Sequence, residues 1–201
     1  MKFNKLGQSD LEVSSYCLGS MTWGEATSED DGHWQLDFST ENGINFVDTA
    51  EMYPTNPLRK ETAGNTEKII GNWINKRKKR DDIIIATKVV GIGNKTVRNG
   101  QSINKSTMEE ALTNSLKKLK TDYIDLYQLH WPNRGSYHFR QNWNYNPIHQ
   151  DTEKIKQDIP ALPKKIYSSA HTNMQDKFDK MTKQPENYPR RFFVNERDFI
   201  E

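Results

Sequence analysis

The feature that most constrains the fold is a regular alternation of short apolar segments with longer amphipathic ones. The apolar segments have the length and hydrophobicity of buried strands: Tyr16–Gly19, Ile44–Val47, Asp82–Thr87 and Tyr123–Leu129. The amphipathic segments repeat apolar side chains at helical spacing: about Ser28 to Asn42, Asn65–Lys79 and Ser106–Lys120. Alternation of strands and helices is typical of parallel βαβ units. The sequence therefore predicts an α/β fold with a parallel sheet.

The connections in this pattern are of two kinds. Each link from a helix to the next strand is only a dipeptide: Asn42–Gly43, Arg80–Asp81 and Thr121–Asp122. Each link from a strand to the next helix is long, and these links cover residues 51–64, 91–105 and 131 to about 150. The long loops therefore gather at the carboxyl ends of the strands, which is the face that carries the chemistry in (β/α)8 barrels.

The chain is predicted to begin with a β-hairpin, because Lys2–Leu6 and Leu11–Ser14 flank the turn-forming residues GQSD. The predicted fold class is α/β, of the (β/α)8 TIM-barrel type, incomplete with about four βα units. Residues 1–150 are expected to form the N-terminal part of the barrel and residues 151–201 a divergent, irregular tail. The tail holds four of the eight prolines and shows no further strand–helix alternation.

Three local details can also be predicted. In the first helix, Trp34, Leu36 and Phe38 are expected to be partly buried. The third helix has a capping-box-like start, STMEE, at Ser106. Cys17 lies within the first barrel strand, so we expect a core side chain and not a nucleophile.

Three successive strands end on an ionisable side chain, namely Asp48, Lys88 and His130. Because side chains alternate along a strand, each lies on the same side as the residue two positions before it. Neighbouring parallel strands lie about 4.8 Å apart, so we expect these groups to converge at equivalent heights and Asp48 to pair with Lys88. Tyr53, one short loop beyond Asp48, can lean over the same end of the sheet.

A carboxylate, an ammonium, a phenol and an imidazole have a coherent joint chemistry. A tyrosine titrates near pKa ~10, and we expect Lys88 to lower the pKa of Tyr53 while Asp48 holds Lys88 charged. His130 could orient a carbonyl oxygen by hydrogen bonding. Tyr53 would then act as a general acid that protonates this oxygen while hydride arrives on carbon. No side chain supplies hydride, so a nicotinamide cofactor is required.

Four segments, in order along the chain, resemble a known family: CLGSMTWG, GINFVDTAEMYP, IIIATKV and TDYIDLYQLHWP. They are similar to the N-terminal half of the aldo-keto reductase superfamily, and the loop PLRKETAGNTE is most similar to its Tas-like bacterial subgroup. The resemblance covers roughly residues 1–135. It implies a (β/α)8 barrel, NADPH as the cofactor, and reduction of aldehyde or ketone carbonyls to alcohols.

The resemblance also implies roles for individual residues. The catalytic tetrad falls on Asp48, Tyr53, Lys88 and His130. The cofactor-binding residues are those just after the first barrel strand together with the tetrad carboxylate: Ser20, Met21, Thr22, Trp23 and Asp48. Trp23 and Trp131 are expected to contact the substrate. Trp131 opens an aromatic loop for which two readings stay open, local packing or an apolar wall for the substrate.

Composition and residue spacing give no support for several other classes of function. The chain has 29 Lys and Arg against 27 Asp and Glu, so its total charge gives no argument for nucleic acid or a membrane. The basic run Asn75–Arg80 closes a helix and is interpreted as a solvated face. The histidines lack metal-ligand spacing, so no metal site is predicted. One cysteine and no long apolar stretch suit a cytoplasmic protein.

Two rival functions remain open. One is a Schiff-base lyase that uses Lys88. The other is a non-catalytic remnant or interaction protein, because the tail lacks the family's fifth-strand pattern and the later phosphate-binding loops. If the chain is such a non-catalytic protein, we expect weak NADPH binding and self-association through open sheet edges.

Overall fold

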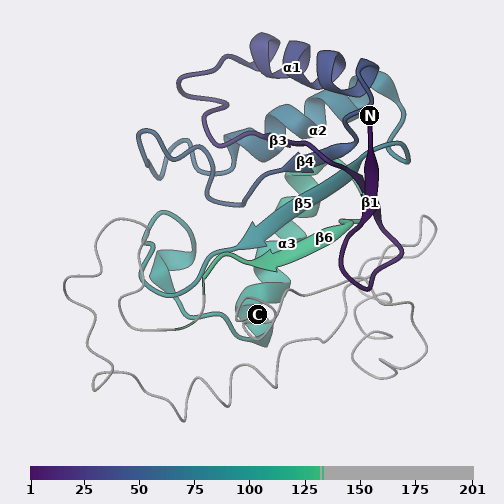
Figure 1. The fold of residues 1–201 in the computed structure, drawn as a ribbon. Coiled ribbons are helices and arrows are strands. Elements are labelled where there is room, and N and C mark those ends of the chain that lie inside the picture. Colours follow the sequence, from purple (N-terminus) through teal and green to yellow (C-terminus); the bar gives the residue numbers. More distant parts are fainter. Residues whose placement is uncertain (132, 134–201) are drawn as a thin grey trace, which may run out of the picture.

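The computed structural model describes residues 1–131 and 133, and it begins with the predicted hairpin (Figure 1). Strands β1 (Phe3–Lys5) and β2 (Glu12–Ser14) pair antiparallel. The barrel-type sheet follows, with four parallel strands in chain order: β3 (Cys17–Gly19), β4 (Phe46–Asp48), β5 (Ile84–Val89) and β6 (Leu126–Leu129). The predicted parallel α/β fold is therefore confirmed.

Helices fill the connections between the strands: α1 (Glu29–Glu41), α2 (Asn65–Arg77) and α3 (Lys105–Leu119). A short 3₁₀ turn, η1 (Arg98–Gly100), lies in the loop after β5. Helix α2 packs between α1 and α3, as Figure 1 shows. None of the helices that the structure describes is both long enough and apolar enough to cross a membrane.

The main hydrophobic core lies between the helices and the sheet, and it determines which side chains face the other way. Val47, Ile85 and Tyr127 are each at most 1% exposed and belong to this core. Burial of one such aliphatic side chain contributes about 1.5–3 kcal/mol. Since side chains alternate along a strand, Asp48 and Lys88 project from the opposite face of the sheet. Because the core residues face the helices, Asp48 and Lys88 lie on the face of the sheet away from the helices.

The strand register corrects one expectation about these groups. Asp48 lies opposite Ala86, and Lys88 lies opposite Gln128. Lys88 is therefore two residues further along its strand than the neighbour of Asp48, not at the same height. A stagger of this sense follows from the tilt of strands in a barrel-type sheet.

Three further expectations were wrong in detail. Trp34 and Phe38 are 64% and 53% exposed and stack on each other on the outer face of α1, whereas Leu36 is fully buried. Cys17 is exposed and is not a core residue. The third helix does not begin at Ser106. It begins at Lys105, and its capping box joins Asn104, two residues before Ser106, to Thr107. The predicted tail, residues 151–201, and most of the aromatic loop lie outside the described residues.

Candidate active site

The carboxyl ends of β4 and β5 are joined by an ion pair. The Nζ of Lys88 lies 2.6 Å from Oδ2 of Asp48 and 2.8 Å from the carbonyl oxygen of Thr49. The side chain of Lys88 is 12% exposed and that of Asp48 is 29% exposed. The long lysine side chain spans the register offset between the two strands. Burial lowers the pKa of Lys88, while the nearby Asp48 opposes this shift.

Tyr53 lies over this pair, as expected for a residue one short loop beyond β4. Its backbone is fixed at both ends, because its N–H donates to Ala50 at 3.0 Å and its carbonyl accepts from Gly64 at 2.8 Å. The Nζ of Lys88 is 4.9 Å from the centre of the Tyr53 ring. The ring of His130 meets the ring of Tyr53 edge to face, with centroids 5.7 Å apart. The structure therefore brings the four side chains of the sequence prediction into one cluster.

The electrostatics of the cluster differ from the sequence expectation. Burial, and secondarily the charge of Asp48, raises the pKa of Tyr53 to about 12, so the predicted lowering by Lys88 is wrong. The carboxylate of Asp48 offsets the ammonium charge that was expected to act on the phenol. Burial and the positive charge of Lys88 lower the pKa of His130 to about 3. At neutral pH the site therefore presents a protonated phenol and an uncharged imidazole.

The residues after β3 divide into two groups. Ser20 is 1% exposed and its Oγ donates to the carbonyl oxygen of Asp48 at 2.7 Å, so it lies at the site. Met21 is 49% exposed. Thr22 hydrogen-bonds to Thr27 through the two hydroxyl groups, 3.0 Å apart. This segment therefore contacts the site through Ser20.

Trp23 is not part of the open site. It is 1% exposed, its indole N–H donates to Gln35 at 3.2 Å, and it belongs to the main core. A Cβ at Gly32 of α1 would lie only 3.2 Å from the indole, so the helix packs closely on it. The substrate contact expected of Trp23 finds no geometric support, because a side chain buried under α1 is not accessible.

Trp131 is adjacent to the site but also buried. Its ring centroid lies 5.1 Å from that of His130, and it is 6% exposed. Its indole N–H donates to the carbonyl oxygen of Ile92 at 3.1 Å. A Cβ at Gly91 would collide with this indole, so the loop after β5 packs directly on it. Of the two readings for this residue, local packing has direct support.

Two residues at the site were missed by sequence reasoning. Glu51 and Arg98 form an ion pair in which both side chains are 4% exposed, between the loop of Tyr53 and the loop after β5. A signal was present for Glu51, because an acidic residue stands between apolar residues in the segment that links Asp48 to Tyr53. Arg98 lies 47 residues further along in an irregular loop, and no pattern connects it to Glu51.

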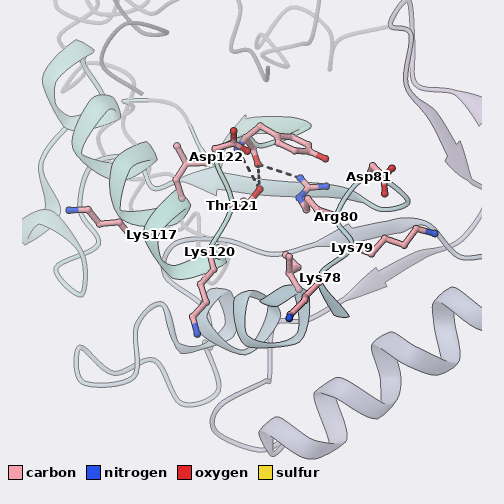
Figure 2. Close-up of a pocket in the computed structure, with 11 residues that line it drawn as sticks. Lys78, Lys79, Arg80, Asp81, Lys117, Lys120, Thr121 and Asp122 are labelled. Carbon is pink, nitrogen blue, oxygen red and sulfur yellow. Dashed lines mark hydrogen bonds between the residues drawn. The ribbon is translucent and has the colours of Figure 1, made fainter. Parts of the chain in front are cut away.

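A separate hollow lies at the other end of the sheet, among the links that lead into β5 and β6 (Figure 2). Its apolar lining is Ile74, Leu116 and Tyr123, and cations surround it: Lys78, Lys79, Arg80, Lys117 and Lys120. In Figure 2 the lysine side chains extend in different directions and do not converge. Arg80 is engaged by the carboxylate of Asp125. The exposed Lys78 and Lys79 fit the solvated basic face that the sequence predicts, whereas the side chain of Arg80 is only 12% exposed and does not.

Residues 16–165 of the chain match the aldo/keto reductase family. Protein tas of Escherichia coli is 49% identical over 137 residues, a match that covers 67% of this chain and 39% of that protein. The aldo-keto reductase YhdN of Bacillus subtilis is 33% identical over 137 residues and is covered to 38%. The chain thus spans about two fifths of the length of these relatives.

Solved structures show the same likeness. The holo form of aldo-keto reductase AKR11C1 from Bacillus halodurans is 32% identical with a TM-score of 0.55, and the match covers 80% of this chain and 45% of that one. A thermostable aldo-keto reductase in complex with the inhibitor epalrestat is 30% identical with a TM-score of 0.53, covering 66% of this chain and 44% of that one.

Proposed function

The chain belongs to the aldo/keto reductase family, and we propose on this basis that it reduces aldehyde or ketone carbonyls to alcohols with hydride from NADPH. The observation that carries the proposal is the cluster at the carboxyl ends of β4 and β5. Lys88 is paired with Asp48 at 2.6 Å and lies under the ring of Tyr53, with His130 at the ring edge. A small carbonyl compound is the substrate class that this donor set fits.

In the proposed reaction Tyr53 donates the proton. Its pKa is raised to about 12, so the phenol carries its proton throughout the neutral range. An alkoxide that forms as hydride reaches the carbonyl carbon is a much stronger base than a phenolate, and it takes this proton. The ammonium of Lys88, anchored by Asp48 and the carbonyl of Thr49, lies 4.9 Å from the centre of this ring and opposes only in part the cost that burial and Asp48 impose on the phenolate.

His130 orients the substrate oxygen in this proposal. With its pKa lowered to about 3, the imidazole is neutral and offers an N–H to a carbonyl oxygen without competing for the proton. An uncharged donor beside Lys88 also avoids a second positive charge in the same cluster. The proton therefore comes from Tyr53 and not from His130.

One observation supports the fit of a nicotinamide cofactor to this site. Gly19 lies opposite Asp48 in the register, and no heavy atom comes within 4 Å of the position that a Cβ on Gly19 would occupy. A flat ring can therefore approach the carboxylate from the side of β3. Ser20, Met21, Thr22 and Asp48 would hold the nicotinamide end there, with Trp23 supporting the segment from the core. The bound cofactor supplies the hydride.

Replacement of Tyr53 by Phe tests the proposal. We expect carbonyl reduction, followed by NADPH oxidation at 340 nm, to fall by about 10²–10⁴-fold because the proton donor is lost. Tyr16→Phe is the matched control, since Tyr16 is 68% exposed and has no part in the proposed reaction. Near-parental turnover in Tyr53→Phe would assign the acid to another residue. A parent protein that binds no cofactor and reduces no carbonyl would instead favour the non-catalytic interpretation.

The Schiff-base lyase stays a second candidate because burial lowers the pKa of Lys88, which favours a nucleophilic amine. Against it, Asp48 and the Thr49 carbonyl engage the ammonium and favour its charged form. Borohydride trapping of a carbonyl substrate on Lys88 would support the lyase.

We also propose a cytoplasmic location, because the chain has a single cysteine.

A further inference from the structure

We infer that Glu51 and Arg98 form a positioning clamp that holds the loop of Tyr53 against the end of β5. The catalytic consequence of this clamp rests on the proposed function, whereas its effect on loop placement does not. Neither clamp side chain hydrogen-bonds to the side chain of Asp48 or Lys88, so the clamp acts through the backbone.

The clamp closes around the backbone N–H and C=O groups of one residue, Val90. The carboxylate of Glu51 accepts from the N–H of Val90 at 2.6 Å through Oε1 and from Nη1 of Arg98 through Oε2. The other arm of the guanidinium, Nη2, donates to the carbonyl oxygen of Val90 at 3.0 Å. Both side chains are 4% exposed, so these charge-assisted hydrogen bonds are made away from water.

The position of Val90 connects the clamp to the site. Val90 is two residues beyond Lys88, and Glu51 is two residues before Tyr53. The backbone N–H of Glu51 also donates to the carbonyl of Lys88 at 3.3 Å. A shift of Glu51 relative to Val90 would therefore move the phenol relative to the ammonium that lies 4.9 Å from its ring. Misplacement of reacting groups by about 1 Å can reduce rate by about 10²-fold.

Backbone conformation gives independent support. Arg98 and the following Asn99 have φ values of 42° and 52°, in the left-handed region that non-glycine residues rarely adopt. Such strain persists only where the surroundings impose it, and here the ion pair with Glu51 anchors the strained turn. The strained segment is the one that delivers the guanidinium to Val90.

The sheet contains a matched control pair. At the amino end of β5, the carboxylate of Asp125 accepts from the N–H of Ile85 at 2.9 Å and from the guanidinium of Arg80. The chemistry is the same, with side chains 7% and 12% exposed, but this pair lies at the end of the sheet away from Tyr53. Substitutions at Asp125 therefore report what the loss of a buried ion pair does to the fold alone.

Amide hydrogen exchange on the full chain tests the placement claim without any need for turnover. In Glu51→Ala we expect the N–H of Val90 to exchange at least about 10-fold faster than in the parent. Glu51→Gln, which keeps an acceptor for Val90 but loses the ion pair, should fall between the two. Asp125→Asn should leave exchange at Val90 unchanged. Unchanged protection of Val90 in Glu51→Ala would overturn the clamp.

Kinetics of the same variants test the catalytic consequence. We expect kcat to fall by about 10²-fold in Glu51→Ala with KM for the carbonyl changed less than about threefold, and by less in Glu51→Gln. Asp125→Asn should keep its kcat per folded molecule. Equal losses in Glu51→Ala and Asp125→Asn would reduce the pair to a structural role. A parent without turnover would overturn the proposed function, and hydrogen exchange would still decide the clamp.

Discussion

The pKa of the Cys17 thiol shows that the negative charge of Asp48 acts on the neighbouring strand β3. Cys17 lies opposite Phe46 in the register, so its side chain shares the sheet face of Asp48. Although the residue is exposed, surrounding protein atoms desolvate the thiol, and with the charge of Asp48 they raise its pKa from 9.0 to about 11. A thiolate at that position is disfavoured by the same carboxylate that holds Lys88.

Alkylation of the single cysteine measures this effect directly. At pH 8 a pKa of about 11 leaves about 100-fold less thiolate than the ordinary value of 9.0, so iodoacetamide should react slowly and its rate should rise until about pH 11. Asp48→Asn should lower the midpoint of this profile, because one of the causes is removed. A midpoint near pH 9 in the parent would contradict the desolvation of the thiol.

At the residue scale, part of the site could be predicted from the sequence. The pairing of Asp48 with Lys88 could be predicted, because both follow apolar runs and parallel strands end at one edge. The raised pKa of Tyr53 could not, since it depends on how far Asp48 offsets Lys88 and on burial in the folded loop. The Glu51–Arg98 clamp was missed for the same reason, because only the fold brings the two loops together.

At the scale of elements, Glu67 couples one helix to the sheet and to another helix. It lies on α2, is completely buried, and accepts from the hydroxyl of Thr87 on β5 at 2.7 Å. The Nζ of Lys118 on α3 is 3.7 Å from its second oxygen. Burial raises the pKa of Glu67 above 4.5, although Lys118 and Thr87 oppose this shift. The folded state therefore binds the Glu67 proton more tightly than the unfolded state does.

Linkage gives the sign of the resulting pH dependence. Because the folded pKa is the higher one, this group favours folding at low pH, and its contribution declines as pH rises from about 4.5 toward the raised value. Glu67→Gln keeps an acceptor for Thr87 without the charge, so we expect the variant to be more stable than the parent at pH 8 and about equally stable at pH 4. Urea unfolding at the two pH values measures this, with the exposed Glu110→Gln as control. Lower stability of Glu67→Gln at pH 8 would mean that the ionised, Lys118-paired form is the favoured one.

Helices and strands were more predictable than the details of their surfaces. The expected helix at 65–79 corresponds to α2, Asn65–Arg77, because its apolar spacing is regular and it ends at a residue in the left-handed conformation. Trp34 and Phe38 were placed wrongly because hydrophobicity alone does not orient a helix. Leu36 occupies the face of α1 that belongs to the main core, and residues two positions to either side must point outward.

At the scale of the whole molecule, the two ends of the sheet have different tasks. The amino end is tied by Arg80 to Asp125 and bordered by solvated lysines. The carboxyl end holds the Asp48–Lys88 pair and the half-buried imidazole of His130. At the carboxyl end, burial shifts the pKa values of Tyr53, Lys88 and His130 and so costs folding free energy. Functional sites in proteins often carry such a cost in stability.

His130 should make this cost visible in the stability of the whole protein. Its pKa falls from 6.5 unfolded to about 3 folded, so between these values only the unfolded state takes up the proton. Stability must therefore fall as pH drops below 6.5, by up to about 1.4 kcal/mol per pH unit from this group, in the opposite sense to Glu67. Among the described residues, the ammonium of Lys88 and the rings of Tyr53 and Trp131 face the imidazole, and the charge of Lys88 disfavours its protonation.

The comparison of the parent with His130→Asn isolates this contribution, because asparagine does not titrate. Thermal unfolding followed by circular dichroism from pH 7.5 to pH 4 should show the parent losing Tm relative to the variant as pH falls, whatever their difference at pH 7.5. The change should begin near pH 6.5, where the unfolded imidazole starts to bind its proton. A Tm difference that stays constant across this range would mean that His130 titrates normally in the folded protein. His130 could then act as a neutral donor to a carbonyl oxygen only above about pH 6.5.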